Sequence, residues 1–263
     1  MALTHGSLFS GIGGIDIGLE WAGFETAWQV DNSDFCQKVL TKRWPNVPKF
    51  LDVKDVGKHN LTPVNIISGG FPCQDVSIAA GGKKRGLGER SGLWFEFARI
   101  IRELRPDWVL VENVPHLKNH GADFVLTDLA EANYSATPTL VGSNLFEAPF
   151  KRQRVYILAH NNDHPCKRIG EGVVDGWTLS PNTERKMAEV RENWNRWKHE
   201  LGTRNVSAPG DPEESESTTY ARGRRELYGV PDWAHRLNAL GNACVPVVPA
   251  LIGEFIQNYE RHK

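Results

Sequence analysis

Apolar segments with strand patterns alternate with amphipathic helical patterns along most of the chain, and this alternation limits the available folds. Apolar residues recur at i, i+4, i+8 and i+11 from Leu93 to Leu104, which indicates one apolar helix face. Strands are predicted at residues 3–9, 26–30, 64–68, 107–114 and 155–159, and helices at 15–22, 34–44, 93–104, 124–132 and 247–259. The alternation predicts an α/β fold, a Rossmann-like doubly wound, mostly parallel sheet with ligands beyond the carboxyl ends of its strands.

The composition changes after residue 160, where the alternation stops. Residues 161–233 are rich in Gly, Pro, Ser, Thr and charged residues and contain one predicted helix, at 181–201. We therefore expect residues 1–160 and 234–263 to form the α/β domain, and residues 161–233 to form a small inserted domain.

A glycine-rich turn, Phe9-Ser-Gly-Ile-Gly-Gly, lies between the first predicted strand and the first predicted helix. Gly11 and Gly13 let the backbone approach a ligand at a helix N-terminus, where nucleotides commonly bind. The spacing is not G-x-G-x-x-G, because position 16 is Asp16. The turn thus indicates a nucleotide-like ligand rather than a dinucleotide, and a tight structural turn is the alternative.

Two aspartates lie where a nucleotide needs hydrogen-bond acceptors. Asp31 ends the second predicted strand, a position from which a carboxylate accepts hydrogen bonds from ribose hydroxyls. Asp52, directly before Val53, is a candidate acceptor for the exocyclic amine of adenine. The alternative for each aspartate is to cap a helix or a turn.

Cys73 follows a buried strand and the entry Gly-Gly-Phe-Pro, which turns the chain sharply. A thiol exposed there, near a helix start, favours the thiolate and can act as a nucleophile. The alternative is a buried cysteine that behaves as a small hydrophobic residue, although the preceding proline argues against a strand interior. Glu112 follows Val-Leu-Val, so the next strand holds a carboxyl group at its mouth, where desolvation favours the protonated form.

The overall charge does not indicate a general nucleic-acid binder. The formal net charge is −1, from 31 Lys and Arg against 32 Asp and Glu. One basic group lies just after Cys73, although a solvated face is the alternative for any run of charge.

The cysteine pattern and the apolar runs exclude other classes. The four cysteines form no C-x-x-C pair, so free thiols are expected rather than disulfides or a zinc site. No apolar run approaches the roughly 18 residues of a membrane span, and the first residues lack the pattern of a secretion signal. We therefore expect a cytoplasmic protein without a membrane partner.

Five segments of the chain resemble, in the same order, segments of DNA (cytosine-5) methyltransferases of the bacterial and phage type. They are SLFSGIGGIDIGLEWAGFE, GGFPCQDVSIAAGGKKRGLGERSGLW, VENV, KRQRVYIL and LNALGNACVPVVPALIG. The order of Pro-Cys-Gln, Glu-Asn-Val and Gly-Asn-x-x-x-Pro makes the resemblance specific, and it extends from Ser7 to Gly253. It implies the fold of the class I S-adenosylmethionine-dependent methyltransferases, with residues 161–233 as the target-recognition region.

The resemblance implies a reaction on a cytosine that is flipped out of double-stranded DNA. Cys73 resembles the thiol that attacks C6, and Glu112 the carboxyl group that contacts N3 and the exocyclic amine. Arg154 resembles the residue that reaches O2, and Arg152 its partner near the DNA backbone. The covalent adduct makes C5 nucleophilic, C5 accepts the methyl group, and loss of the C5 proton releases Cys73.

The resemblance also implies S-adenosylmethionine as the cofactor, S-adenosylhomocysteine as the product, and no metal. The implied cofactor residues are Phe9, Gly11, Gly13, Asp31, Asp52, Val53, Gly70, Pro72, Leu93 and Asn242. Residues 74–90 resemble a mobile loop that closes on DNA. The implied DNA contacts are Gln74, Ser77, Lys83, Lys84, Arg85 and Arg90.

Two alternative functions remain. The tRNA-methylating branch uses the same chemistry, but its Cys-Phe-Thr element is absent here, since Cys166 is followed by Lys167. A non-catalytic DNA-binding relative is disfavoured because Cys73, Glu112 and both arginines are retained together. A cognate restriction endonuclease acting on the same site is a possible partner, and a monomer is expected because one unit acts on one flipped base.

Overall fold

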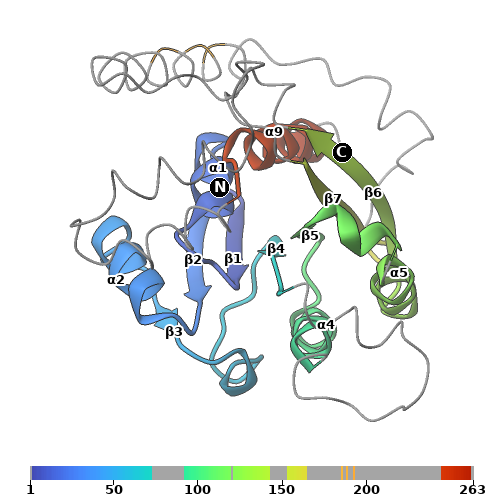
Figure 1. Ribbon diagram of the computed structural model, residues 1–263, viewed down its shortest axis with the longest axis horizontal. Helices are drawn as coiled ribbons and strands as arrows, with labels where there is room; N and C mark the ends of the chain where they lie inside the picture. Colours follow the sequence, from blue (N-terminus) through green and yellow to red (C-terminus); the bar gives the residue numbers. More distant parts are fainter. Residues whose placement is uncertain are drawn as a thin grey trace, which may run out of the picture.

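The computed structural model describes residues 2–72, 92–119, 121–142, 153–164 and 244–261, together with Arg185, Ala188 and Glu192. In these ranges a seven-stranded mixed sheet lies between two layers of helices (Figure 1). The strands are β1 (Thr4–Leu8), β2 (Glu25–Val30), β3 (Lys49–Phe50), β4 (Ile66–Gly69), β5 (Trp108–Asn113), β6 (Tyr134–Gly142) and β7 (Gln153–Asn161). The helices are α1 (Gly14–Trp21), α2 (Asp34–Arg43), α4 (Gly92–Leu104), α5 (Ala122–Glu131) and α9 (Val247–Arg261), with short 3-10 helices η1 (Val53–Asp55) and η3 (Pro115–Asn119).

The strand order is β3-β2-β1-β4-β5-β7-β6. The first five of these strands are parallel, whereas β7 runs antiparallel to both β5 and β6. The chain proceeds one way from β1 to β3 and the other way from β4 to β5, so the topological switch point lies between β1 and β4. The predicted Rossmann-like, mostly parallel fold is confirmed; β3 and β6 were not predicted.

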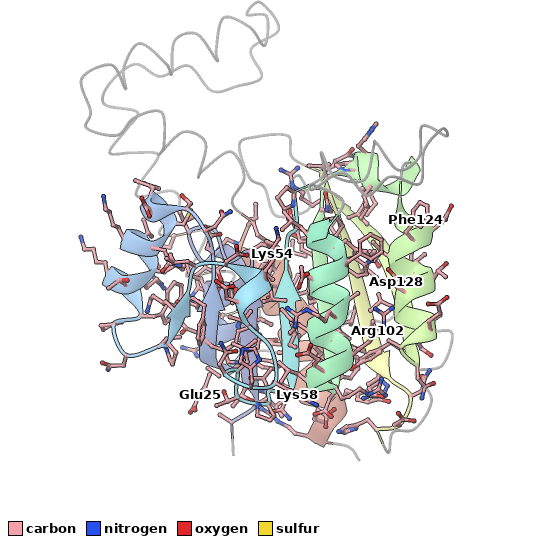
Figure 2. The ribbon with its side chains drawn as sticks, turned by 90° about the horizontal axis from the view of Figure 1, so that it is seen from below. Glu25, Lys54, Lys58, Arg102, Phe124 and Asp128 are labelled. Carbon is pink, nitrogen blue, oxygen red and sulfur yellow. The ribbon has the colours of Figure 1, made fainter. Side chains whose placement is uncertain are left out.

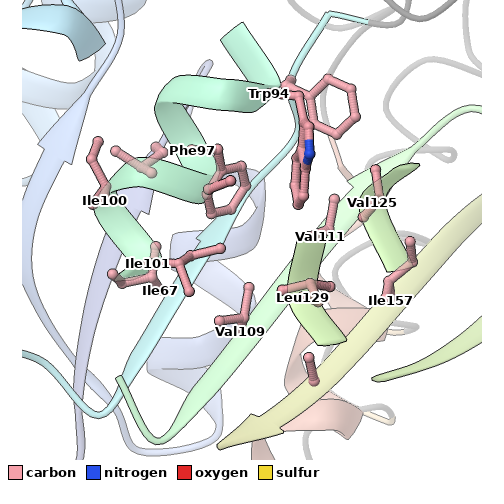
Figure 3. Packing of buried hydrophobic residues seen from close by; sticks show 14 of the residues in the cluster. Ile67, Trp94, Phe97, Ile100, Ile101, Val109, Val111, Val125, Leu129 and Ile157 are labelled. Carbon is pink, nitrogen blue, oxygen red and sulfur yellow. The ribbon is translucent and has the colours of Figure 1, made fainter. Parts of the chain in front are cut away.

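Each face of the sheet is covered by helices because the buried strands carry apolar side chains on both faces. Ile67 of β4 faces α4, where Phe97 and Ile101 pack in the larger core (Figure 3). The neighbouring residue Ile66 belongs to the opposite core with Leu110, in a cluster that includes buried residues of α1 and α9. These two helices cover that face of the sheet (Figure 1). The helix face predicted for residues 93–104 is therefore confirmed.

Polar contacts hold α4 and α5 together above the larger core. Asp128 of α5 faces Arg102 of α4 (Figure 2), at 3.3 Å between Nη2 and Oδ1. The indole Nε1 of Trp94 donates a hydrogen bond to Asp128 Oδ2 at 2.6 Å. Both helices begin near the edge of the sheet where the parallel strands end, so their first residues lie close to that edge.

The C-terminal helix α9 packs against α1, because glycines let the two backbones approach. A Cβ built on Gly18 of α1 would lie 2.2 Å from the carbonyl oxygen of Pro246, just before α9. A Cβ on Gly253 of α9 would lie 2.6 Å from Cβ of Ala22. This contact agrees with placing the last residues in the α/β domain, while the boundaries at 161 and 233 stay predictions.

We expect Gly18→Ala to lower the free energy of unfolding by about 1–3 kcal/mol, because backbone has to move to admit the methyl group. Urea denaturation would measure the change. The matched control is Gly92→Ala, since a Cβ at Gly92, the first residue of α4, meets no atom of the described part of the chain within 4 Å. Equal stability of the two variants would show that close packing of α1 on α9 does not require the glycine.

The described helices include none that is long and apolar enough to cross a bilayer. Of the helix predicted at 181–201, the structure describes Arg185, Ala188 and Glu192, each of them helical. The remainder of the inserted region predicted at 161–233, apart from residues 161–164, lies outside the described residues.

Candidate active site

The carboxyl ends of four neighbouring strands bring the predicted site residues to one edge of the sheet. Phe9 follows β1, Asp31 follows β2, Gly70 follows β4, and Glu112 lies near the end of β5. Since β1, β2, β4 and β5 are parallel neighbours, these residues share the edge at which doubly wound sheets bind ligands. The residues implied to bind the cofactor and those implied to bind the substrate therefore lie at the ends of neighbouring strands.

The glycine-rich turn leaves β1 in a left-handed backbone conformation. The φ angles are 52° at Phe9, 56° at Gly11 and 83° at Gly13, which caps α1. A Cβ at Gly11 would meet no atom of the described residues within 4 Å, whereas one at Gly13 would lie 2.4 Å from the indole ring of Trp44. Gly13 is thus needed for packing and backbone angle, while the turn is open beside Gly11 and fits a ligand that approaches the backbone.

Asp31 holds this turn against the second strand. Its Oδ2 accepts a hydrogen bond from the Gly11 amide at 2.7 Å, and its Oδ1 accepts one from the Ser33 amide at 2.9 Å. Its own amide donates to the carbonyl oxygen of Phe50 at 3.1 Å. Because a carboxylate offers about four acceptor positions, Asp31 keeps capacity for ribose hydroxyls while it fixes the turn.

Asp52 and Val53 occupy different environments. Asp52 is exposed and caps η1, where its side chain accepts from the Lys54 amide at 2.9 Å. Val53 is buried in the larger core, so its side chain is not open to an adenine ring, and its carbonyl oxygen accepts a hydrogen bond from Arg99 Nη2 at 3.1 Å. Leu93, at the start of α4, is partly buried against the same core. The capping alternative for Asp52 is thus observed, and it does not use all acceptor positions of the carboxylate.

Glu112 and Arg154 form an ion pair between β5 and β7. Arg154 Nε lies 2.8 Å from Glu112 Oε1, and the two side chains are only 16% and 9% exposed. A Cβ on Gly70 would lie 2.8 Å from Glu112 Oε2, so the glycine makes room for the carboxylate. The structure therefore brings together Glu112, Arg154 and Gly70, three of the residues singled out from the sequence.

The segment leading to Cys73 is held by the neighbour of Glu112. The side-chain amide of Asn113 donates to the carbonyl oxygen of Phe71 at 3.0 Å, and its Oδ1 accepts from the Val114 amide at 2.8 Å. Phe71 is buried against Trp94, with ring centroids 5.3 Å apart, and Pro72 beyond it is exposed. The end of β4 is thus fixed to the end of β5 directly before the predicted nucleophile.

Several predicted site residues lie outside the described residues. They are Cys73, Gln74, Ser77, Lys83, Lys84, Arg85, Arg90, Arg152 and Asn242. Their roles stay predictions. Among the residues that the structure does describe, no group of three or more His, Cys, Asp or Glu side chains is arranged to hold a metal ion.

Comparison with known proteins identifies the chain. The sequence profile described as C-5 cytosine-specific DNA methylase matches residues 3–226. The chain belongs to this family. Among curated methylases, it is 34% identical to the type II methyltransferase M2.BsuMI of Bacillus subtilis, over 60% of this chain and 42% of the relative. It is 35% identical to the type II methyltransferase M.Eco47II of Escherichia coli, over 66% of this chain and 42% of the relative.

Solved structures show the same fold. The Entamoeba histolytica methyltransferase EhMeth aligns with a TM-score of 0.53 at 19% identity, over 61% of this chain and 53% of that chain. The Schizosaccharomyces pombe Dnmt2 methyltransferase aligns with a TM-score of 0.50 at 20% identity, over 61% and 49%. The chain thus spans about half the length of the curated methylases and solved structures that it matches.

A buried polar cluster that lies behind the glycine turn of this family member was not predicted from the sequence. Asp16 of α1 accepts hydrogen bonds from Ser7 Oγ at 3.1 Å and from Gln29 Nε2 at 2.8 Å. Nearby on β1, His5 Nε2 lies 2.7 Å from Ser68 Oγ of β4. Burial raises the pKa of Asp16 to about 6, against the opposing effect of its hydrogen bonds, and burial lowers the pKa of His5 to about 3. The one available signal was Asp16 itself, a carboxylate on an otherwise apolar helix face.

These shifts predict opposite effects of pH on stability. The contribution of Asp16 is present below about pH 4 and is lost as the pH rises through about 6, because its folded-state pKa is raised. The contribution of His5 is present above about pH 6.5 and is lost as the pH falls towards 3. We expect the parent to lose up to about 3 kcal/mol relative to Asp16→Asn between pH 4 and 7, as measured by urea denaturation. The exposed Asp55→Asn is the control, and a pH-independent difference for Asp16→Asn would contradict the prediction.

Proposed function

We propose that this family member transfers a methyl group from S-adenosylmethionine to C5 of a cytosine flipped out of a short double-stranded DNA site. The observation that carries the proposal is the Glu112–Arg154 ion pair at the same edge of the sheet as the open glycine turn. A fixed carboxyl group and a guanidinium are suited to the N3 and O2 edge of cytosine, and the turn is suited to a nucleotide-like cofactor. Family membership supports the same reaction.

Glu112 contacts N3 and the exocyclic amine of the flipped cytosine and stabilises the negative charge that develops in the ring. Its carboxylate is paired with Arg154, with Oε1 2.8 Å from Nε, and Oε2 lies beside Gly70. Arg154 Nη1 donates to the Gln153 carbonyl at 2.8 Å, which leaves further guanidinium N–H groups for cytosine O2. A preorganised pair of this kind needs little rearrangement when charge develops.

Cys73 is the proposed nucleophile, and its thiolate sulfur forms a bond to C6. Only Pro72 separates it in sequence from Phe71, whose carbonyl is held by Asn113, so the proposed nucleophile directly follows an anchored segment. The electron pair displaced from the C5–C6 bond makes C5 nucleophilic, with Glu112 acting on N3. After C5 has accepted the methyl group, loss of its proton re-forms the double bond and expels the Cys73 thiolate.

S-adenosylmethionine supplies the electrophilic methyl group when it is bound. Gly11 and Asp31 are proposed to hold its ribose, with Asp52 and the Val53 backbone at adenine and Asn242 near the methionine end. Leu93 packs on the base, and Phe9, Gly13, Gly70 and Pro72 complete the contact. These assignments are supported by the open turn at Gly11 and by the free acceptor positions of Asp31.

Double-stranded DNA is the proposed substrate, with Arg152 and the basic residues of 74–90 at its phosphates. We propose recognition of the site by residues 161–233, action as a monomer, and a companion restriction endonuclease. Membership of the C-5 cytosine-specific DNA methylase family and the similarity to type II methyltransferases support the choice of DNA.

The test is bisulfite sequencing of mixed-sequence duplex DNA incubated with the protein and S-adenosylmethionine. We expect conversion-resistant cytosines at one recurring short site and none when the cofactor is omitted. Resistant cytosines in an equal amount of tRNA, with none in DNA, would replace the proposal by an RNA methyltransferase. Resistance in neither substrate would overturn methyl transfer by this chain.

A further inference from the structure

Tyr156 is buried next to the proposed substrate site and has no role in the proposed reaction. It is directly opposite Glu112 in the antiparallel pairing of β5 and β7, and it is two residues from Arg154 on the same strand. Its side chain is buried, and burial, together with Cys244 and Glu112 nearby, raises its pKa well above the usual value. The hydroxyl therefore stays protonated and can serve as a hydrogen-bond donor beside the ion pair.

The partner of this hydroxyl is the buried thiol of Cys244. Tyr156 Oη lies 3.1 Å from Cys244 Sγ, across 88 residues of sequence. Cys244 Sγ is also 3.6 Å from the Val245 carbonyl oxygen, which can accept only from the thiol hydrogen. The arrangement that uses every group has the thiol donating to Val245 and its sulfur accepting from Tyr156.

The backbone of Cys244 lies against the cofactor turn. A Cβ on Gly14, the first residue of α1, would be 2.4 Å from the Cys244 carbonyl oxygen and 3.1 Å from its amide nitrogen. Gly14 directly follows Gly13, which caps the helix. Cys244 therefore contacts the start of α1 through its backbone and Tyr156 through its side chain.

We infer that Tyr156 is a positioning residue that, through Cys244, fixes the Glu112–Arg154 pair relative to the Gly13–Gly14 start of α1. The inference rests on the proposed function, because the proposed function assigns the ion pair to the substrate site and the glycine turn to the cofactor site. Loss of the hydroxyl removes the hydrogen bond that joins this end of the β5–β7 pair to the segment that precedes α9. The orientation of the cytosine site relative to the methyl donor is then less strictly held.

The experiment compares Tyr156→Phe, Cys244→Ala, Cys244→Ser and the double variant Tyr156→Phe/Cys244→Ala with the parent. Calorimetry measures the dissociation constant for S-adenosylhomocysteine, and methyl transfer to duplex DNA gives kcat. We expect each of the first two variants to weaken S-adenosylhomocysteine binding and to lower kcat by about three- to tenfold, the size of one lost hydrogen bond. The double variant should be no worse than either single variant, and Cys244→Ser should return to within about twofold, since a hydroxyl still accepts from Tyr156.

A matched control separates positioning from stability. Tyr134 is also a buried tyrosine, and its hydroxyl donates to the Pro106 carbonyl at 2.7 Å, at the start of β6 and therefore away from the carboxyl edge of the parallel strands. Tyr134→Phe removes a comparable hydrogen bond, so it should lower the melting temperature but leave the dissociation constant and kcat unchanged.

Two results would overturn the inference. If Tyr156→Phe behaved like Tyr134→Phe, with a lower melting temperature but with the parental dissociation constant and kcat, the role of Tyr156 would be structural alone. Additive losses in the double variant would show that Tyr156 and Cys244 act separately. A parent that neither binds S-adenosylhomocysteine nor methylates DNA would instead overturn the proposed function, and the inference would fall with it.

Discussion

Replacement of Cys73 by serine is expected to lower methyl transfer at least about a thousandfold, because the residue that starts covalent catalysis is lost. A hydroxyl in the same place ionises far less readily than a thiol, so little nucleophile is present at neutral pH. The measurement is transfer of a labelled methyl group to duplex DNA at saturating cofactor and DNA. Binding of S-adenosylhomocysteine should stay within about twofold of the parent, since the proposed cofactor contacts are unchanged.

The control for this prediction is another cysteine of the chain. Cys36 of α2 is a buried free thiol whose side chain interacts with Asp31, and Cys36→Ala should retain the covalent step that Cys73→Ser loses. Duplex DNA with 5-fluorocytosine at the target gives a second readout, because a fluorine at C5 cannot leave as a proton and the bond between Cys73 and C6 then persists. The parent and Cys36→Ala should form this covalent complex. If Cys73→Ser formed this covalent complex, or if it methylated DNA at the parental rate, the nucleophilic role of Cys73 would be contradicted.

The framework of the site could be predicted from the sequence because it depends on local patterns. Strand and helix periodicity placed Phe9, Asp31 and Glu112 at or near the ends of three predicted strands, and the rule for parallel sheets placed those strand ends at one edge. The glycines of the turn were informative because Gly11 and Gly13 adopt positive φ angles. These features require no knowledge of distant contacts.

Two strands could not be predicted, for different reasons. β3 has only two residues, Lys49–Phe50, which is too short for periodicity to be detected. β6 lies at the edge of the sheet beyond β7, contains Pro138, and exposes several of its residues, so its pattern is neither buried nor alternating. Because β6 was not predicted, no local pattern indicated that β7 runs antiparallel to its two neighbours.

The internal contacts of the site depend on tertiary register. Glu112 and Arg154 were each placed at the substrate by resemblance, but their ion pair follows from the pairing of Glu112 with Tyr156 across β5 and β7. The Asp16 cluster likewise requires α1 to pack over β1 and β2, where Ser7 and Gln29 supply the donors. Neither pairing has a spacing in sequence that a local pattern could reveal.

Replacement of Glu112 by glutamine is expected to lower kcat about 100- to 1,000-fold, the range found when one preorganised charge-stabilising group is removed. The amide has nearly the same shape, so it still fits beside Gly70, but it neither carries the charge that pairs with Arg154 nor exchanges a proton with cytosine N3. The KM for DNA should change less than kcat, because the interaction strengthens as charge develops in the ring. Single-turnover methyl transfer would measure the chemical step directly.

The matched control is Glu103→Gln, which removes the same charge from another arginine pair. Glu103 Oε1 lies 2.8 Å from Arg99 Nη1 on α4, and its side chain is 29% exposed, against 9% for Glu112. Partly exposed pairs on a helix contribute about 0.3–0.5 kcal/mol, so this variant should keep the parental kcat with little loss of stability. If Glu112→Gln also kept the parental kcat, the carboxyl group would have no part in activating the base. If both variants had lower activity and a lower melting temperature, the loss of activity would arise from the fold. A loss of kcat in Glu112→Gln alone would assign the effect to the position of Glu112 at the flipped cytosine.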